Sequence, residues 1–399
     1  MLLVGIALRS LPGLDIIGAN IDSKWSATLR KMALVVILTR AGLGLDPKAL
    51  REMSLMVLRL GILPNVVEMT VVAVVSHFLL QFPWLWSFML GFILAGVSPS
   101  VVVPCMLNLS DNGYGINKGI PTLVIAGLSV DNVISISGFG VMLGIIFSEG
   151  SIVWQALKGP IEVMVGLGYA LFMGSLTWYL PNRNEKGSSK FKFVLLFASG
   201  LLAIFGSMKV GFGGAGPIAC LGTAFVAGVG WRKQGCMDAK DPIKKNFNFI
   251  WQFFLPLLFG LIGTEIKISA LNGSTVGFGF ITLLISLTFR VLTSYFSVLG
   301  GDLNLRERIF VALAWLPKAT IQAAVGSTAL DVARAIDGNP DFESAEEALG
   351  KQVLTIAVLV ILAAAPIGAA AIMLSAPKLL HKKVFKEDAI KEEKDIQSV

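Results

Sequence analysis

The sequence that decides the fold is AGVSPSVVVP at residues 95–104, which has a counterpart far along the chain in AWLPKATIQ at residues 314–322. Each stretch places proline in the middle of an apolar segment. Proline removes a backbone donor and its ring clashes with the carbonyl one turn back, so we expect both helices to break near Pro99, Pro104 and Pro317. Broken helices at corresponding positions in two halves of a chain indicate an inverted-repeat membrane fold.

The composition around these stretches is that of a polytopic membrane protein. Of 399 residues, 55% are hydrophobic and 15% are charged, and the mean hydropathy is +0.76, which excludes an ordinary soluble chain. We therefore expect one all-α transmembrane domain over residues 1–399, with a charged cytosolic tail at 377–399. The apolar segments, about twelve in number, are 2–11, 27–44, 56–80, 86–108, 119–147, 155–180, 193–209, 215–230, 247–270, 274–298, 307–327 and 351–375.

The first apolar segment, 2–11, is too short to span a bilayer. Met1 leads directly into apolar residues, with no polar n-region and no signal-type cleavage site. We predict that there is no signal peptide and that the chain begins inside a helix, with N-terminal helices missing.

Basic loops predict the orientation in the membrane. The connections 181–192 and 231–246 and the tail carry most loop lysines and arginines, whereas 328–350 is acidic. By the positive-inside rule the basic loops and both termini are cytosolic. The basic residues around Arg30 are an exception, since the segment count places them near the outer side. The net charge of +7 thus comes from the excess of lysine and arginine in the cytosolic loops, and no nucleic-acid partner is predicted.

Several function classes lack their sequence signals. Cys105, Cys220 and Cys236 are scattered without a CxxC pair, so a zinc or haem site is not expected. No GxxxxGK[ST] loop occurs, which disfavours ATP-driven transport. We predict a protein that is not an enzyme and has no cofactor.

Asp131 is the only charged residue in the 30-residue stretch 119–148, and Asn132 follows it. A carboxylate near the middle of a bilayer is costly unless it faces a wet cavity or a partner, so Asp131 is a candidate ion or proton site. The alternative is an aspartate neutralised by a neighbouring helix for packing.

The charged residues Glu68, Arg290 and Lys318 also lie within apolar segments. Glu68 and Arg290 would each be expensive alone, so we expect them to pair, either as a fixed bridge or as part of a gate. Lys318 lies inside the second broken helix, where a buried lysine can release its proton when a carboxylate partner takes up a cation. Glu265, near a segment end, is expected to be solvated.

Five motifs together resemble one family. They are AGLGLD at 41–46, GVSP at 96–99 with VVVP at 101–104, GYG at 113–115 with KGIPT at 118–122, PLLFGLIGTE at 256–265 and AWLPKAT at 314–320. The chain is similar over nearly its whole length to the animal NHA-type sodium/hydrogen exchangers, solute carrier 9 subfamily B of the cation/proton antiporters. The resemblance implies an NhaA-like core with two crossed, broken helices, a separate dimerisation domain, a homodimer and alternating access of elevator type.

The resemblance also implies roles for single residues, with one departure. Lys318 would face Asp131, and Glu68 and Arg290 match other charged positions of the family. Similar exchangers carry two adjacent aspartates, and electroneutral cousins carry Asn-Asp, whereas this chain has Asp131-Asn132. An asparagine oxygen can still ligate sodium, but it cannot exchange a proton near neutral pH.

The leading hypothesis is a secondary active antiporter that exchanges Na⁺ or Li⁺ for H⁺ and contributes to pH regulation. Na⁺ would bind at Asp131 with help from Asn132 and Ser98, while Asp131 and Lys318 couple the proton. One titratable carboxylate, Asp131, favours one-for-one, electroneutral exchange; the alternative is that Lys318 also releases a proton when sodium binds, which would make the exchange electrogenic. The plasma membrane is the expected location, with an intracellular membrane as the alternative. Two other hypotheses remain: a transport-impaired paralogue with a regulatory or assembly role, and an organic-anion/sodium symporter or channel of similar architecture.

Overall fold

The computed structural model describes residues 1–44, 55–148, 152–180, 188–234, 242–270, 273–337 and 344–382, and the regular elements in these ranges are helices. The helices are α1 (Leu2–Ser10), α2 (Asp15–Ala19), α3 (Ser23–Gly44), α5 (Leu55–Leu80), α6 (Trp84–Ala95), α7 (Pro99–Asp111), η1 (Ile116–Lys118), α8 (Ile120–Ile146), α9 (Ile152–Tyr179), α10 (Ser188–Leu201), η2 (Leu202–Gly206), α11 (Ser207–Lys209), α12 (Ala215–Lys233), α13 (Pro242–Thr264), η3 (Ile268–Ala270), α14 (Gly273–Ser297), α15 (Leu305–Leu313), α16 (Thr320–Gly326), α17 (Thr328–Asp337) and α18 (Ala345–Leu379).

The all-helical fold agrees with the sequence prediction, and each of the twelve predicted segments contains helix. Eight candidate spans in the described part of the chain are long and apolar enough to cross a membrane. The predicted segments 2–11, 27–44, 215–230 and 307–327 are helical but are not among these eight. For 307–327 the reason is the break itself, because α15 and α16 are short separate helices.

Both predicted breaks are present, although Pro104 does not cause one. Helix α6 ends at Ala95 and α7 begins at Pro99, where a missing N–H costs nothing because the first turn has no partner for it. The prediction for Pro104 was wrong, since α7 continues through that residue. In the second break, Pro317 lies in the connection between the end of α15 and the start of α16.

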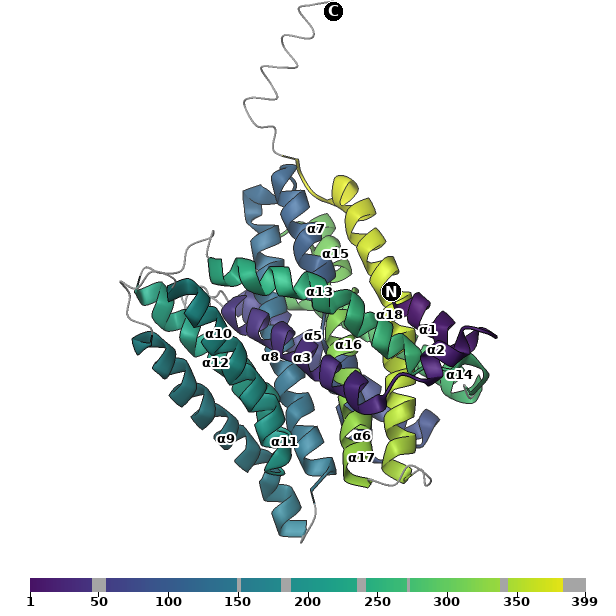
Figure 1. Cartoon of the computed structure of the whole chain (residues 1–399). Coiled ribbons are helices and arrows are strands. Elements are labelled where there is room, and N and C mark those ends of the chain that lie inside the picture. The colour runs from purple at the N-terminus through teal and green to yellow at the C-terminus, as the bar shows by residue number, and fades with distance from the viewer. Residues whose placement is uncertain are drawn as a thin grey trace, which may run out of the picture.

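The two breaks contact each other through backbone atoms. The amide of Ser98 donates to the carbonyl of Pro317 at 2.9 Å. A Cβ on Gly96 would lie 3.0 Å from side-chain atoms of Ile321, so the missing side chain permits this close crossing. In Figure 1, α7 and α15 lie above the crossing, and α6 and α17 lie below it.

The helices pack as two groups around the crossing. Helices α3, α9, α10, α12 and α13 contact one another, and α3 and α13 run obliquely across the front of the molecule (Figure 1). Helices α5, α6, α8, α14 and α18 form the second group, which contains the broken helices. The site described below lies where α3 and α13 face the crossing.

A network of charges links the far ends of the two groups; we term it the distal network. Its members, Arg30, Glu265, Asp331, Arg334, Glu347 and Lys351, come from α3, the end of α13, α17 and α18. Arg30 bonds Asp331 and donates to Glu265 at 3.0 Å, and Arg334 donates to the other oxygen of Glu265 at 3.0 Å. Arg30 is therefore a buried structural cation, which explains why it departs from the loop-charge rule.

Glu265 is not solvated as the sequence suggested, because its side chain is only 14% exposed and bonds two arginines. Burial alone would raise the pKa of Glu265, but the guanidinium groups of Arg30 and Arg334 outweigh burial and lower this pKa below its ordinary value. The carboxylate is thus held in its charged form by its two partners.

Candidate ion-binding site

Four buried charges meet beside the crossing and form what we term the charge cluster: Glu68 in α5, Asp131 in α8, Arg290 in α14 and Lys318 in the second break. All four side chains are 0% exposed. Arg290 bonds the carboxylate of Glu68, so the structure brings the sequence-predicted pair together. Two acids and two bases give the cluster no net charge when all four are ionised.

Asp131 is held by three donors. Its Oδ2 accepts the amide of Val97, in the first break, at 2.9 Å. Its Oδ1 accepts Nη2 of Arg290 at 2.6 Å and Nδ2 of Asn65 at 3.1 Å. Asn65 was missed in the sequence, although its position three residues before Glu68 places both on one face of α5.

Lys318 does not contact Asp131 directly. Its Nζ donates to Oε2 of Glu68 at 2.7 Å and to the carbonyl of Ala95 at 3.0 Å. Oε2 of Glu68 therefore serves both cations, while Oε1 has no hydrogen-bond partner among the described residues. The contact between Asp131 and Arg290 replaces the one that the family resemblance implied.

The cations also stabilise the broken end of α6, whose last carbonyls lack helical partners and carry the negative end of the helix dipole. The carbonyl of Ala95 accepts from Arg290 at 2.6 Å and from Lys318. Gln322 of α16 donates to the carbonyls of Ile93 at 2.9 Å and Gly96 at 2.7 Å. The crossing is thus satisfied by side chains from the other half of the chain.

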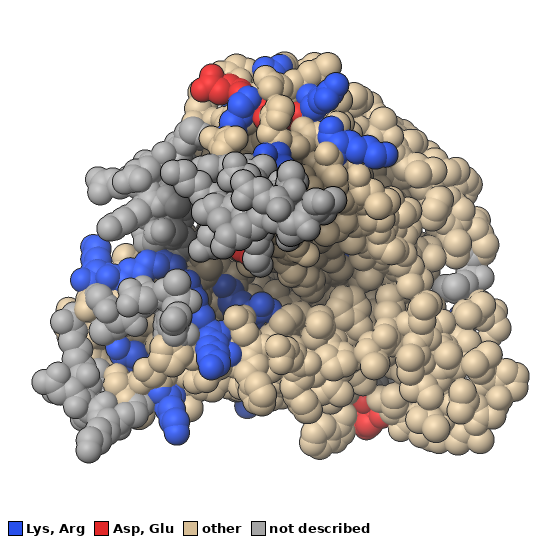
Figure 2. Space-filling view, turned by 90° about the horizontal axis from the view of Figure 1, so that it is seen from above, with Lys and Arg blue, Asp and Glu red and all other residues tan. Residues whose placement is uncertain are grey.

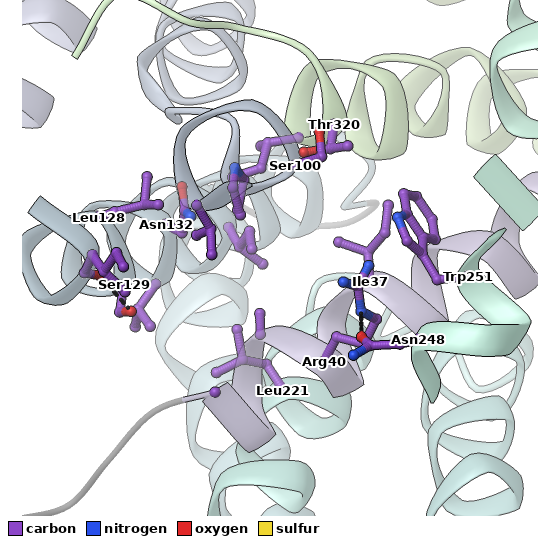
Figure 3. Close-up of a pocket in the computed structure, with 18 of the residues that line it drawn as sticks. Ile37, Arg40, Ser100, Leu128, Ser129, Asn132, Leu221, Asn248, Trp251 and Thr320 are labelled. Atoms are coloured by element: carbon purple, nitrogen blue, oxygen red, sulfur yellow. Dashed lines mark hydrogen bonds between the residues drawn. The ribbon is translucent and has the colours of Figure 1, made fainter. Parts of the chain in front are cut away.

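A cavity of about 500 Å³ leads to this region, and Asn132 lines it while Asp131 does not. In Figure 3, Asn132 of α8, Ser100 of α7 and Thr320 of α16 lie on one side of the cavity, opposite Arg40 of α3. Adjacent helical residues point about 100° apart, which separates Asn132 from the charge cluster that holds Asp131.

Neutral oxygens gather at the inner end of this cavity. Oδ1 of Asn132 is buried without a hydrogen-bond partner in the described part of the chain. The hydroxyl of Ser98 lies 3.0 Å from that of Ser100 and 3.1 Å from that of Thr320. Such oxygens are the ligands that hard cations prefer. Thr320 and Ser100 were not predicted as site residues.

The other end of the cavity is basic. Arg40 donates to Asn248 at 2.9 Å and its guanidinium lies 5.4 Å from the ring centroid of Trp251, so it links α3 to α13 (Figure 3). Lys244 also lines the cavity. Viewed from the end where α7 and α15 lie, the surface is hollowed and Lys and Arg side chains gather beside the hollow (Figure 2).

Two crossed broken helices, with ionisable residues buried at the crossing and a cavity leading to them, are the features of a secondary membrane transporter. The fold comparison agrees: the sodium proton antiporter MjNhaP1 from Methanocaldococcus jannaschii, solved at pH 8, superimposes with a TM-score of 0.67 at 18% identity. That match covers 95% of this chain and 91% of the antiporter. The family model "Sodium/hydrogen exchanger, transmembrane" matches residues 1–374.

Proteins with similar sequences belong to the same family and indicate the subfamily within it. Sodium/hydrogen exchanger 9B2 of Xenopus tropicalis is 46% identical over 382 residues, covering 96% of this chain and 69% of that protein. The human protein of that name is 44% identical with the same coverage, and human sodium/hydrogen exchanger 9B1 is 39% identical, covering 96% and 72%. The chain belongs to the sodium/hydrogen exchanger family, in the 9B subfamily.

Proposed function

We propose that this protein exchanges Na⁺ or Li⁺ for H⁺ by alternating access, with the cation bound between Asp131, Asn132 and Ser98. The charge balance of the cluster is the observation that carries the proposal. With Glu68, Asp131, Arg290 and Lys318 all ionised the region is neutral, so an added cation would leave an uncompensated positive charge in a dry interior.

Loss of one proton restores neutrality, and Lys318 is the group that can lose it. Arginine stays protonated in proteins, so Arg290 cannot serve. A cation near Asp131 and Glu68 competes with the ammonium group for the same negative charge, which favours release. One Na⁺ then replaces one H⁺, and the exchange is electroneutral.

The cation would reach Asn132 first, because that residue lines the cavity. Its unpartnered Oδ1, the hydroxyl of Thr320 and the hydroxyl of Ser98 supply neutral oxygen ligands. Asp131 supplies the negative charge one residue away on α8. The cation would have to draw Asp131 partly away from Arg290, so we expect weaker binding than at a site with a free carboxylate.

A direct test is cation-induced proton release from the purified protein in a weakly buffered solution. Addition of Na⁺ or Li⁺ should release about one proton per bound cation, since each cation displaces one proton. Choline chloride is the control for ionic strength. Lys318→Gln, which keeps a hydrogen-bonding group without the titratable charge, should abolish release. Release that persists unchanged in Lys318→Gln would show that another group carries the proton.

One observation favours a second candidate function, a transport-impaired paralogue with a role in regulation or assembly. The position that faces the cavity holds an amide, whereas the remaining acid at 131 is bound to Arg290. A protein of this kind would release no protons on addition of Na⁺. In that case Asn132→Asp should create release, because it restores an acid at the cavity wall.

We also propose a homodimer in the plasma membrane, with the basic loops on the cytosolic side, as the loop charges predict. Accessible-cysteine labels at 186–189 should then react from the cytosol and labels at 338–346 from the other side. Both label sites include residues outside the described ranges. Labelling of both from the same side would overturn this orientation.

A further inference from the structure

A further acidic side chain, outside the charge cluster, is buried in a membrane span. Glu162 in α9 is 0% exposed and lies in the candidate span Leu157–Tyr179. Neither of its carboxyl oxygens has a hydrogen-bond partner among the described residues. An ionised carboxylate without partners is very costly in such a place, so the group is expected to be neutral.

The carboxyl of Glu162 lies in a notch made of glycines. A Cβ on Gly144 of α8 would be 1.6 Å from Oε2 of Glu162, and a Cβ on Gly214, just before α12, would be 2.3 Å from the same oxygen. The carbonyl oxygen of Gly140 lies 2.2 Å from that second position. The carboxyl of Glu162 and the carbonyl of Gly140 therefore both lie beside Gly214; a protonated carboxyl has a hydrogen to donate there, whereas a carboxylate only accepts.

The charge of Lys158, four residues before Glu162 on α9, acts on this carboxyl from beyond ion-pair distance. On its own helix, Lys158 donates to the carbonyl of Phe147 at 3.3 Å, and no ion pair between Lys158 and Glu162 occurs in the described ranges. The faces of α8 and α12 at the notch are glycines, without titratable side chains. The Gly214 amide lies close by without completing a hydrogen bond to Glu162.

We propose that Glu162 is a second proton-binding site, which holds the end of α8 against α9 and α12 while its carboxyl is protonated. Helix α8 also carries Asp131 and Asn132, about 20 Å away along its axis at 1.5 Å per residue. Ionisation would leave a charge in the glycine notch, so the carboxylate must move towards water and α8 must separate from α9. The proton concentration at that end of α8 therefore sets how firmly the helix packs.

Cysteine cross-linking in the full-length protein tests this coupling. Gly159 of α9 faces Ile145 of α8, since a Cβ there would lie 3.0 Å from the Ile145 side chain. Ile145→Cys and Gly159→Cys, with Cys105, Cys220 and Cys236 replaced, should cross-link when α8 is packed. Comparison with the same pair carrying Glu162→Gln removes the pH dependence of thiol chemistry. We divide the cross-linking rate of the cysteine pair in the protein with Glu162 by its rate in the protein with Glu162→Gln. This ratio should fall by about tenfold per pH unit once Glu162 ionises.

Glu346→Gln, at an exposed site on α18, is the control because it removes an acid elsewhere. With this substitution the cross-linking ratio should depend on pH as it does without it. A ratio that is constant with pH would overturn the proposal.

Infrared spectroscopy provides an independent readout, because the carbonyl stretch of a protonated carboxylic acid should be lost in Glu162→Gln. No loss would mean that Glu162 is ionised, which would contradict the proposal. Failure of Glu162→Gln to fold would also count against the proposal, since glutamine closely matches a neutral glutamate.

Discussion

The charge cluster and the distal network contain the same residue types, but they use them differently. In the distal network each oxygen of Glu265 accepts from its own arginine; Arg30 is buried, whereas Arg334 is 29% exposed. In the charge cluster Arg290 and Lys318 share one oxygen of Glu68, while Oε1 of Glu68 and Nε of Arg290 have no partner among the described residues. Unused donors and acceptors allow partners to be exchanged, which suits an ion site, whereas a saturated network suits a fixed connection.

The cavity and the distal network lie at opposite ends of α3 and α13. On α3, Arg40 lines the cavity and Arg30 joins the distal network, ten residues or about 15 Å away. On α13, Asn248 lines the cavity and Glu265 follows the other end. The distal network therefore joins the two helix groups where the cavity does not reach.

The largest effect is expected from Arg290→Ala, because it leaves both Glu68 and Asp131 without their arginine in a dry interior. Breaking a buried charge pair costs about 3–5 kcal/mol. Folded yield and thermal stability in detergent should fall severely. Arg306→Ala, at an exposed arginine, is the matched control and should be close to neutral.

The double variant Glu68→Ala with Arg290→Ala sharpens this result. It should recover only part of the loss, since Asp131 also loses Arg290. A double variant whose loss equals the sum of the two single losses would mean that Glu68 and Arg290 do not interact energetically.

A smaller loss is expected from Arg30→Ala in the distal network. Asp331 loses its arginine, but Glu265 keeps Arg334. We expect about 3 kcal/mol, the lower end of the range for breaking a buried charge pair, because only one carboxylate is left without an arginine. Arg30→Lys should restore only part of this, because lysine lacks the planar fork that holds two carboxylates. Thermal unfolding measures both, and full rescue by lysine would contradict this geometry.

The distal network should also give the protein a sensitivity to acid. The lowered pKa of Glu265 means that its contribution is fully present above the ordinary glutamate value of 4.5. That contribution is lost as the pH falls through the lower pKa of the folded state. The loss of thermal stability between about pH 5 and pH 3 should be shallower in Glu265→Gln. An equal slope in both proteins would argue against the two arginine contacts.

The smallest effect is expected from Lys351→Ala. Lys351 pairs with Glu347 at 3.1 Å along one helix and its side chain is 43% exposed. Exposed pairs four residues apart contribute about 0.3–0.5 kcal/mol. A loss above about 1 kcal/mol would contradict this, because it would show that Lys351 supports the buried members of the distal network through Glu347.

The sequence predicted the elements well because its signals were local. Apolar segments and internal prolines predicted the helices and both breaks, and the cost of buried charge predicted the pairing of Glu68 with Arg290. Pro104 was misleading, since a proline alone does not show whether a helix ends or continues through it. The partners of Asp131 and Glu265 depend on which helices meet in three dimensions, and that information is not local.

The same limit applies to Asn132. The sequence showed that an amide replaces an expected acid, but only the structure shows that this residue, and not Asp131, lines the cavity. Asn65 could have been found from its spacing to Glu68 on α5. The contact of Gln322 with the end of α6 had no such signal, because it joins residues that are more than 200 positions apart.

The central claim is that a charge-balanced cluster exchanges one cation for one proton, and flux in proteoliposomes tests it most directly. Na⁺-driven proton flux should be present in the wild-type protein and unchanged by an imposed membrane potential, because one charge moves in each direction. Lys318→Gln should abolish it. Flux that depends on the potential would contradict the one-for-one exchange, and absence of flux in wild type with activity in Asn132→Asp would contradict transport by this cluster altogether.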